Sequence, residues 1–252
     1  MTPDVVVDIG NTRMKWGRCA DGRVAEMVSL AGEIPEDWSL QVPKWNLGTG
    51  LNWAVATVQP KWQKSFARWA EARGDRAHVI NRAHIPIPVE VDEPESVGID
   101  RLLNALAASR RAPANTPIVV ISVGTAVTVD LVRADGSFAG GVIFPGPRLM
   151  AESLHRFTAK LPRVPIDRVD PRDPPCKNTR TAIQTGISFA VMGGASLLVD
   201  EMTGSAKAKA WVVMTGGALG DLAGYHFGKV ANTITDSTLT LEGIRIAAEA
   251  LL

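Results

Sequence analysis

The sequence predicts an α/β protein made of two related halves with a cleft between them. The duplication is indicated by two strings 114 residues apart, Val5–Thr12 and Val119–Ala126, which both run from a β-branched segment through a polar residue to a glycine. The same offset relates the dipeptides Asp21-Gly22 and Asp135-Gly136, which are typical of β-hairpin turns. We therefore expect each half to open with three strands joined by two tight turns.

Helices are expected to follow these strands, because apolar residues there recur at helical spacing. We predict helices over residues 60–73, 96–111, 179–203 and 239–252, with Ser96 as the N-cap of the second, and a buried strand over 210–215. Residues 162–175 contain five prolines and are predicted to form a loop. The segment 111–117, with two prolines, sets the predicted halves at 1–114 and 115–252.

Charge and composition exclude several classes of protein. The 27 basic and 26 acidic residues nearly cancel, so nothing in the net charge favours a nucleic acid or an anionic membrane as partner. The N-terminal segment lacks the pattern of a secretory signal, and the apolar segment 116–132 is interrupted by polar residues, so no membrane span is expected there. Two distant cysteines make no disulfide framework. We expect a cytoplasmic protein.

The first motif whose residues could bind a ligand is the segment from Asp8 to Lys15. Gly10 lets the backbone approach a bulky anion, Asn11 and Thr12 offer hydrogen-bond donors to phosphate oxygens, and Lys15 adds a positive charge. Asp8 can only accept, so beside phosphates it needs a cation such as water-coordinated Mg²⁺. The alternative is an ordinary hairpin turn followed by an exposed lysine.

The second motif, Gly124-Thr125-Ala126-Val127-Thr128, occupies the equivalent turn of the second half. If the halves face each other, the two turns converge on one polyphosphate, and Gly124, Thr125 and Thr128 contact it. Together, the two motifs favour nucleotide binding over two unrelated turns.

This paired-turn layout resembles the superfamily of acetate kinase, sugar kinases, heat-shock protein 70 and actin, whose halves have a ribonuclease H-like fold. Further strings are similar to type III pantothenate kinase, also described as the Bvg accessory factor family: 98–105, 140–146, Asn178-Thr179 and 215–217. The resemblance covers nearly the whole chain in the right order.

The resemblance implies transfer of the γ-phosphoryl group of ATP, with Mg²⁺, to pantothenate, the first step towards coenzyme A. It implies that Asp100 is the general base, and that Gly216 and Gly217 form the adenosine segment. Thr179 matches a position that contacts pantothenate from a neighbouring subunit, which implies a homodimer. The remaining substrate-binding positions implied in this way are Gly98, Ile99, Arg101 and Val91.

Two positions depart from the family pattern. Ser122 stands where the family usually has an aspartate that helps to hold a monovalent cation, K⁺ or NH₄⁺, and a serine is a weaker, neutral ligand. Val91 stands where an aromatic residue usually contacts the substrate, so the pocket is expected to differ. Neither change removes the base or the phosphate turns.

Two other functions stay open at this point. One is a non-enzymatic regulatory protein on the same fold, which supports transcription through a partner. The other is a kinase of another small hydroxyl compound, such as a sugar. Taken alone, Asp100-Arg101 is also consistent with an acidic residue at a helix start, where the helix dipole favours it, followed by a surface arginine.

Overall fold

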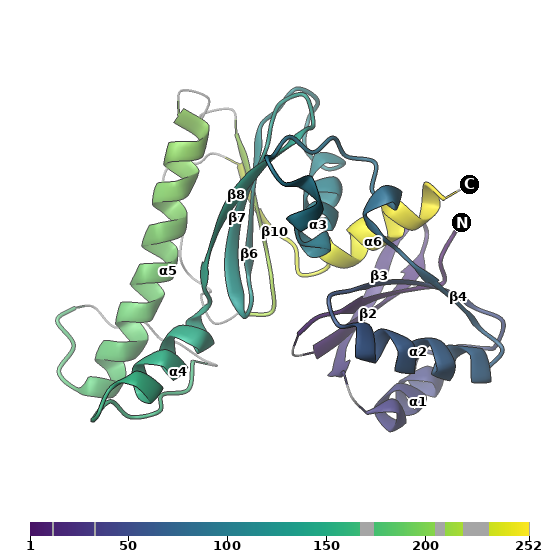
Figure 1. Cartoon of the computed structure of the whole chain (residues 1–252), viewed down its shortest axis with the longest axis horizontal. Helices are drawn as coiled ribbons and strands as arrows, with labels where there is room; N and C mark the ends of the chain where they lie inside the picture. The colour runs from purple at the N-terminus through teal and green to yellow at the C-terminus, as the bar shows by residue number, and fades with distance from the viewer. Residues whose placement is uncertain (12, 33, 167–173, 205–209, 219–231, 252) are drawn as a thin grey trace. The chain divides into compact units, whose positions relative to one another are not determined.

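A computed structural model describes residues 1–11, 13–32, 34–166, 174–204, 210–218 and 232–251. The chain forms two units, Met1–Arg111 with Thr238–Leu252 (unit 1) and Ala112–Ser237 (unit 2). Each unit has its own five-stranded sheet, with helices packed against it (Figure 1).

The sheet of unit 1 has the strand order β3-β2-β1-β4-β5. Its first three strands form an antiparallel meander, and the last two run parallel to the first. The strands are β1 (Val5–Ile9), β2 (Arg13–Ala20), β3 (Arg23–Ala31), β4 (Asn52–Thr57) and β5 (Arg76–Val79). Because β1 is central and pairs with neighbours on both sides, its residues read as a near-continuous apolar run.

Helices cover both faces of this sheet (Figure 1). One face carries α1 (Pro35–Lys44) and α2 (Pro60–Ala72), and the other carries α3 (Ile99–Ser109) and α6 (Leu239–Glu249). Two short 3₁₀ helices, η1 (Arg82–His84) and η2 (Pro94–Ser96), lie in the connection between β5 and α3.

The core under α1 and α2 is aromatic. Trp16, Trp38, Trp53 and Phe66 are almost completely buried, and Trp16 meets Trp53 edge to face, with ring centroids 4.9 Å apart. The indole N–H of Trp53 donates to Asp75 at 3.0 Å, so this polar group is satisfied inside the core.

The sheet of unit 2 repeats the topology, with the order β10-β9-β6-β7-β8. Again the first three strands are antiparallel and the last two run parallel to the first. The strands are β6 (Ile118–Val123), β7 (Ala126–Val132), β8 (Phe138–Pro145), β9 (Trp211–Thr215) and β10 (Asn232–Thr235). Both sheets therefore place their third, second, first, fourth and fifth strands side by side in that order.

The long helix α5 (Thr179–Thr203) packs along the sheet of unit 2, and α4 (Pro147–Phe157) packs against α5 (Figure 1). By length and composition α5 is able to cross a membrane, with a mean hydropathy of 1.6 over an 18-residue window. A core helix passes the same test, and 44% of that window is buried in the chain. The core below it is aliphatic, built around Ile121, Val129, Val191 and Val212.

The predicted duplication is confirmed, because both halves begin with a three-stranded meander and share one strand order. The predicted helices over 60–73 and 179–203 and the strand over 210–215 match α2, α5 and β9 within a residue. Residues 162–166, the described start of the predicted loop, have no regular secondary structure, and 167–173 lie outside the described residues.

Two details differ from the prediction. Ser96 is not the N-cap of α3: it ends η2, its hydroxyl donates to the carbonyl of Glu93, and Gly98 occupies the N-cap. The predicted second half, 115–252, included the C-terminal helix, whereas α6 packs on the sheet of unit 1 and belongs to that unit. The sequence spacing could not show this return of the chain, since it depends on which apolar face α6 covers.

Candidate functional site

Asp8 and Lys15 face each other across the first hairpin. They are register partners on β1 and β2, so both side chains project from the same face of the sheet. Burial raises the pKa of the Asp8 carboxyl to about 6; Lys15 opposes this shift, and the nearby negative charge of Asp100 adds to it. The electrostatic coupling places Asp8, Lys15 and Asp100 in one cluster within unit 1.

Asp100 lies in the first turn of α3, after the N-cap Gly98. A carboxylate is favoured there by the unpaired N–H groups and the positive end of the helix dipole. A Cβ on residue 98 would stand 2.6 Å from the Asp100 carboxylate oxygen, so a glycine is needed for this side-chain position. Asp100 is exposed, whereas Ile99 and Arg101 beside it are half-buried. The base candidate therefore faces solvent.

The first turn connects β1 to β2. The amide of Gly10 donates to the carbonyl of Arg13 at 3.1 Å, which closes the turn. Gln59, just before α2, donates its side-chain amide to Asn11 at 2.9 Å and so orients that side chain. Thr12, predicted to contact phosphate, lies outside the described residues.

The second turn, Gly124-Thr125, is held between two other segments of unit 2. The amide of Gly146, the N-cap of α4, donates to the carbonyl of Thr125 at 2.9 Å, and a Cβ on residue 146 would stand 2.1 Å from the carbonyl of Gly124. On the other side, a Cβ on Gly216 would stand 2.2 Å from the carbonyl of Val123, and its φ of +113° also requires glycine. This places the predicted adenosine segment directly beside the second phosphate turn.

The contact with Gly146 was not predicted. The signal for it was present, because Gly146-Pro147 is the typical start of a helix, with proline in the first helical position. The sequence alone could not show that this start lies against the turn at residues 124 and 125.

Ser122 and Thr128 are register partners on β6 and β7, and Thr215 on β9 is the partner of Ser122 on its other side. Three hydroxyl side chains thus stand in one row across the sheet. The Oγ1 of Thr128 is buried with no hydrogen-bond partner among the described atoms. In the ranges that the structure describes, no group of three His, Cys, Asp or Glu residues is suited to hold a metal.

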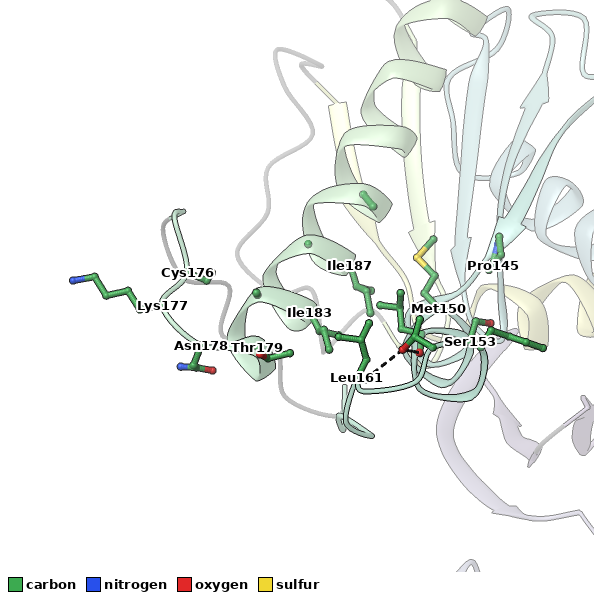
Figure 2. Close-up of a pocket in the computed structure, with 16 residues that line it drawn as sticks. Pro145, Met150, Ser153, Leu161, Cys176, Lys177, Asn178, Thr179, Ile183 and Ile187 are labelled. Atoms are coloured by element: carbon green, nitrogen blue, oxygen red, sulfur yellow. Dashed lines mark hydrogen bonds between the residues drawn. The ribbon is translucent and has the colours of Figure 1, made fainter.

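Thr179 lies apart from these clusters, at the first position of α5, where it is exposed. It lines a cavity of about 980 Å³ between α4 and α5 (Figure 2). The walls are mostly apolar, with Ile183 and Ile187 from α5 opposite Met150 from α4, while Lys177 points away. Val91 lies in the connection between β5 and α3, half-buried, and nothing in the described contacts joins it to Asp100.

The structure therefore assembles two clusters, one in each unit. Unit 1 holds the charged groups Asp8, Lys15 and Asp100, and unit 2 holds the turn at 124–125 with the hydroxyl row and Gly216.

Two solved structures share this arrangement of strands and helices over the full chain. A putative 2-dehydro-3-deoxygalactonokinase from Sinorhizobium meliloti aligns with a TM-score of 0.59 at 12% identity, covering 98% of both chains. Component A of the (R)-2-hydroxyglutaryl-CoA dehydratase from Acidaminococcus fermentans aligns with a TM-score of 0.53 at 15% identity, covering 100% of both. The fold is that of the actin-like ATPases.

The particular family follows from the sequence comparison. The family model of type III pantothenate kinase matches residues 5–201. The type III pantothenate kinase of Desulfovibrio desulfuricans is 33% identical over 97% of this chain and 96% of its own length. That of Desulfosudis oleivorans is 32% identical over 96% and 97%. The chain belongs to the type III pantothenate kinase family.

Proposed function

We propose that this protein transfers the γ-phosphoryl group of ATP to the hydroxyl of pantothenate, giving 4'-phosphopantothenate, the first step of coenzyme A biosynthesis. Membership of the family supports this pair of substrates. The observation that supports the mechanism most directly is the coupled cluster of Asp8, Lys15 and Asp100 in unit 1. It supplies the base and the charges that phosphoryl transfer needs in one place.

In the proposed step, the pantothenate hydroxyl oxygen forms a bond to the γ-phosphorus while the bond from that phosphorus to the β-bridging oxygen breaks, and ADP leaves. Asp100 accepts the hydroxyl proton. Its exposed position in the first turn of α3 suits this role, because a substrate can reach the carboxylate there. The next residue, Arg101, offers a planar guanidinium, which matches the carboxylate of pantothenate in a bidentate way.

We assign the polyphosphate to the two turns. A Cβ on Gly124 would meet nothing in the chain closer than 3.7 Å, so the packing of the chain itself does not demand glycine there. A glycine at this position would instead allow a phosphate to approach the backbone closely. The adjoining N-terminus of α4 adds a favourable dipole for an anion. Gly216 and Gly217 then receive the adenosine.

Asp8 is the proposed partner of Mg²⁺. A half-buried carboxylate beside Lys15 fits a water-coordinated divalent cation, because the cation would offset the charge that burial makes costly. When bound, Mg²⁺ would neutralise charge on the phosphate oxygens.

A monovalent cation fits less well. K⁺ or NH₄⁺ at Ser122 would find neutral hydroxyl oxygens from Thr128 and Thr215 rather than a carboxylate. We therefore expect the activity to depend only weakly on K⁺, in assays that replace K⁺ by a bulky organic cation at constant ionic strength.

We propose that the α4–α5 face of unit 2 forms a homodimer. Large apolar side chains are exposed there, including Phe157 at 78% and Leu197 at 61%. A Cβ added at Gly186 or Gly193 in α5 would meet no atom of the described chain within 4 Å. Packing within one subunit therefore does not require glycine at these positions, although glycine destabilises the middle of a helix. A second copy packed closely on this face would explain both features and would bring Thr179 to a neighbouring subunit. We expect Leu197→Glu to sediment as a monomer.

We expect the protein to act in the cytoplasm, where its substrate ATP is available. The apolar face of α5 is then covered by the second copy rather than by lipid.

One assay separates the candidate functions. The purified chain is incubated with ATP and Mg²⁺ plus pantothenate, a panel of sugars, or no acceptor, and products are identified by mass spectrometry. We expect phosphopantothenate only. A phosphorylated sugar would identify another kinase, and no turnover with any acceptor would favour the regulatory protein. Asp100→Asn, purified in the same way, controls for contaminating kinases.

A further inference from the structure

A partly buried hydrogen bond joins α3, the helix of the proposed base, to the C-terminal helix α6. Thr240, in the first turn of α6, donates its hydroxyl to the side-chain oxygen of Asn104 on α3 at 2.8 Å. Asn104 is only 3% exposed. A buried amide is costly unless it is paired, so this bond selects one position of α3 on α6.

The two backbones also touch at this point. A Cβ on Gly243 would stand 2.2 Å from the carbonyl oxygen of Leu103 and 2.9 Å from its Cα. Gly243 lies one turn after Thr240, and Leu103 precedes Asn104, so the hydrogen bond and the backbone contact form one junction. Neither helix can slide or rotate there without losing the bond or creating a clash.

The helix α6 is in turn fixed to the sheet. Glu242, which precedes Gly243 on α6, is only 6% exposed. Its carboxylate accepts from the backbone amide of Val24 on β3 at 2.8 Å and from Arg245 at 2.8 Å. The position of α6 is therefore defined relative to the same sheet that carries Asp8 and Lys15.

Asn104 stands four residues after Asp100 on α3, so the two lie on the same side of the helix, one turn apart. Fixing Asn104 sets both the rotation of α3 and the height of its first turn. Two hydrogen bonds, from Val24 to Glu242 and from Thr240 to Asn104, thus tie the sheet to α6 and α6 to α3, the helix that carries Asp100.

We propose that Asn104 and Thr240 are positioning residues, which hold the Asp100 carboxylate at the place where it meets the substrate hydroxyl. This inference rests on the proposed role of Asp100. It predicts that losing the bond lowers the catalytic rate more than it lowers the affinity for ATP, because ATP is gripped by other residues.

The test compares Thr240→Val, which removes the donor and keeps the shape, with Thr240→Ser, which keeps the donor. The matched control is Thr203→Val, which removes another buried threonine hydrogen bond, to the carbonyl of Val199 at 2.7 Å in α5. Steady-state kinetics, thermal unfolding and amide hydrogen exchange of residues 101–104 are measured for all four proteins, wild type included.

We expect Thr240→Val to lower kcat about tenfold, because small displacements of a reacting group are costly, with KM for ATP changed less than about twofold. Thr240→Ser should recover most of the rate. Exchange at residues 101–104 should quicken in Thr240→Val alone. Thr203→Val should lose thermal stability to a similar extent and keep its kcat.

Equal rates for Thr240→Val and Thr203→Val, or no recovery in Thr240→Ser, would overturn the positioning role. A parallel rise in the KM for ATP would also overturn it, since it would show a general loss of structure. If wild type does not phosphorylate pantothenate, the proposed function fails instead, and the exchange data still decide whether the bond fixes the first turn of α3.

Discussion

Units 1 and 2 share one strand order but differ in the chemistry that they place on it. Unit 1 sets charged side chains at its first hairpin and at α3, namely Asp8, Lys15 and Asp100. In unit 2 the predicted site consists of backbone at the turn and the hydroxyls of Ser122 and Thr128. The same strand order thus carries ionisable side chains in unit 1 and neutral backbone and hydroxyl groups at the predicted site of unit 2.

The two turns differ in length as well. The last register pair of the first hairpin, Ile9 with Met14, encloses residues 10–13, whereas that of the second, Val123 with Val127, encloses residues 124–126. The hairpins that look alike in sequence are therefore offset by one residue in register. The shorter turn is the one fixed by Gly146 and Gly216.

The cores differ too. In unit 1 the core under α1 and α2 combines indole rings and Phe66 with aliphatic side chains, whereas the buried core cluster of unit 2 consists of valine, isoleucine, methionine and alanine. A single strand topology thus tolerates either filling, provided that the apolar faces and the total volume match.

The largest expected effect tests the charged side of this comparison. Asp100→Asn keeps the size of the side chain and removes its basicity, so we expect kcat with pantothenate to fall about 10²–10⁴-fold. ATP binding, measured by calorimetry, should persist, since the turns are unchanged. Full activity in this variant would remove Asp100 from the mechanism.

The next effect tests the neutral side. In Gly146→Ala the new methyl group meets the carbonyl of Gly124, so the turn must shift, and we expect kcat/KM for ATP to fall about 10²-fold. Thr125→Ala and Lys15→Met should weaken ATP use by less. Gly48→Ala is the control, because a Cβ there has no neighbour within 4 Å. Unchanged ATP kinetics in Gly146→Ala would argue against a phosphate site at the second turn.

The third effect is a loss of stability in the core of unit 1. Asp75 accepts hydrogen bonds from the backbone amide of Leu51, the indole of Trp53 and the guanidinium of Arg73, each at 3.0 Å. Asp75→Ala leaves buried donors unpaired and should lower the free energy of unfolding by about 2 kcal/mol.

Tryptophan fluorescence monitors this loss in unit 1, because six of the seven tryptophans lie there and only Trp211 lies in unit 2. The control is Glu71→Ala, which removes an exposed carboxylate on α2 of the same unit, where we expect little change. Equal losses in the two variants would contradict the role given to the buried carboxylate.

The smallest effect concerns Asp8 and pH. Its pKa is raised from 3.8 to about 6, so the folded state holds this proton more tightly than the unfolded state. Stability without metal should therefore fall as pH rises from about 4 to about 6, by about 1–2 kcal/mol after allowing for partial solvent screening.

Asp8→Asn should remove this loss, so the variant should melt higher than wild type at pH 7 and transfer phosphate poorly. Thermal melts at pH 4, 5, 6 and 7 in the presence of a chelator measure the effect. If the melting temperature of wild type, compared with that of Asp8→Asn, stayed constant or rose from pH 4 to pH 7, this would contradict the idea that burial of the Asp8 charge is unfavourable.

Much of the fold was predictable because it depends on local patterns. The repeated β-branched run with its glycine predicted both hairpins, and the apolar spacing of 60–73 and 179–203 predicted α2 and α5. The N-cap of α3 was not predictable in this way, because Ser96 and Gly98 are both acceptable N-caps. The choice between them depends on where the chain enters the helix.

For the site, the motifs indicated the residue types, and the structure gathered some of them. Asp8, Lys15 and Asp100 lie together in unit 1, while Thr179 lies at the cavity between α4 and α5 in unit 2. Val91 and Asn11 could be placed on their segments but not given a ligand contact. The roles argued for Gly146, Asn104 and Thr240 could not be predicted from local sequence, because they depend on neighbours distant in the chain.

By itself the sequence determined the duplication with its two opening meanders, the helices α2 and α5, the strand β9, and the family, since periodicity and short strings of residues are enough to show these. Only the tertiary structure decided that the last helix returns to the first unit, that Gly146 and Gly216 enclose the second turn, and that Thr240 bonds to Asn104. Those contacts join segments far apart in the chain, such as Val24 and Glu242, which are 218 residues apart, and their geometry is fixed by close packing of backbone and side chains, which no local pattern encodes.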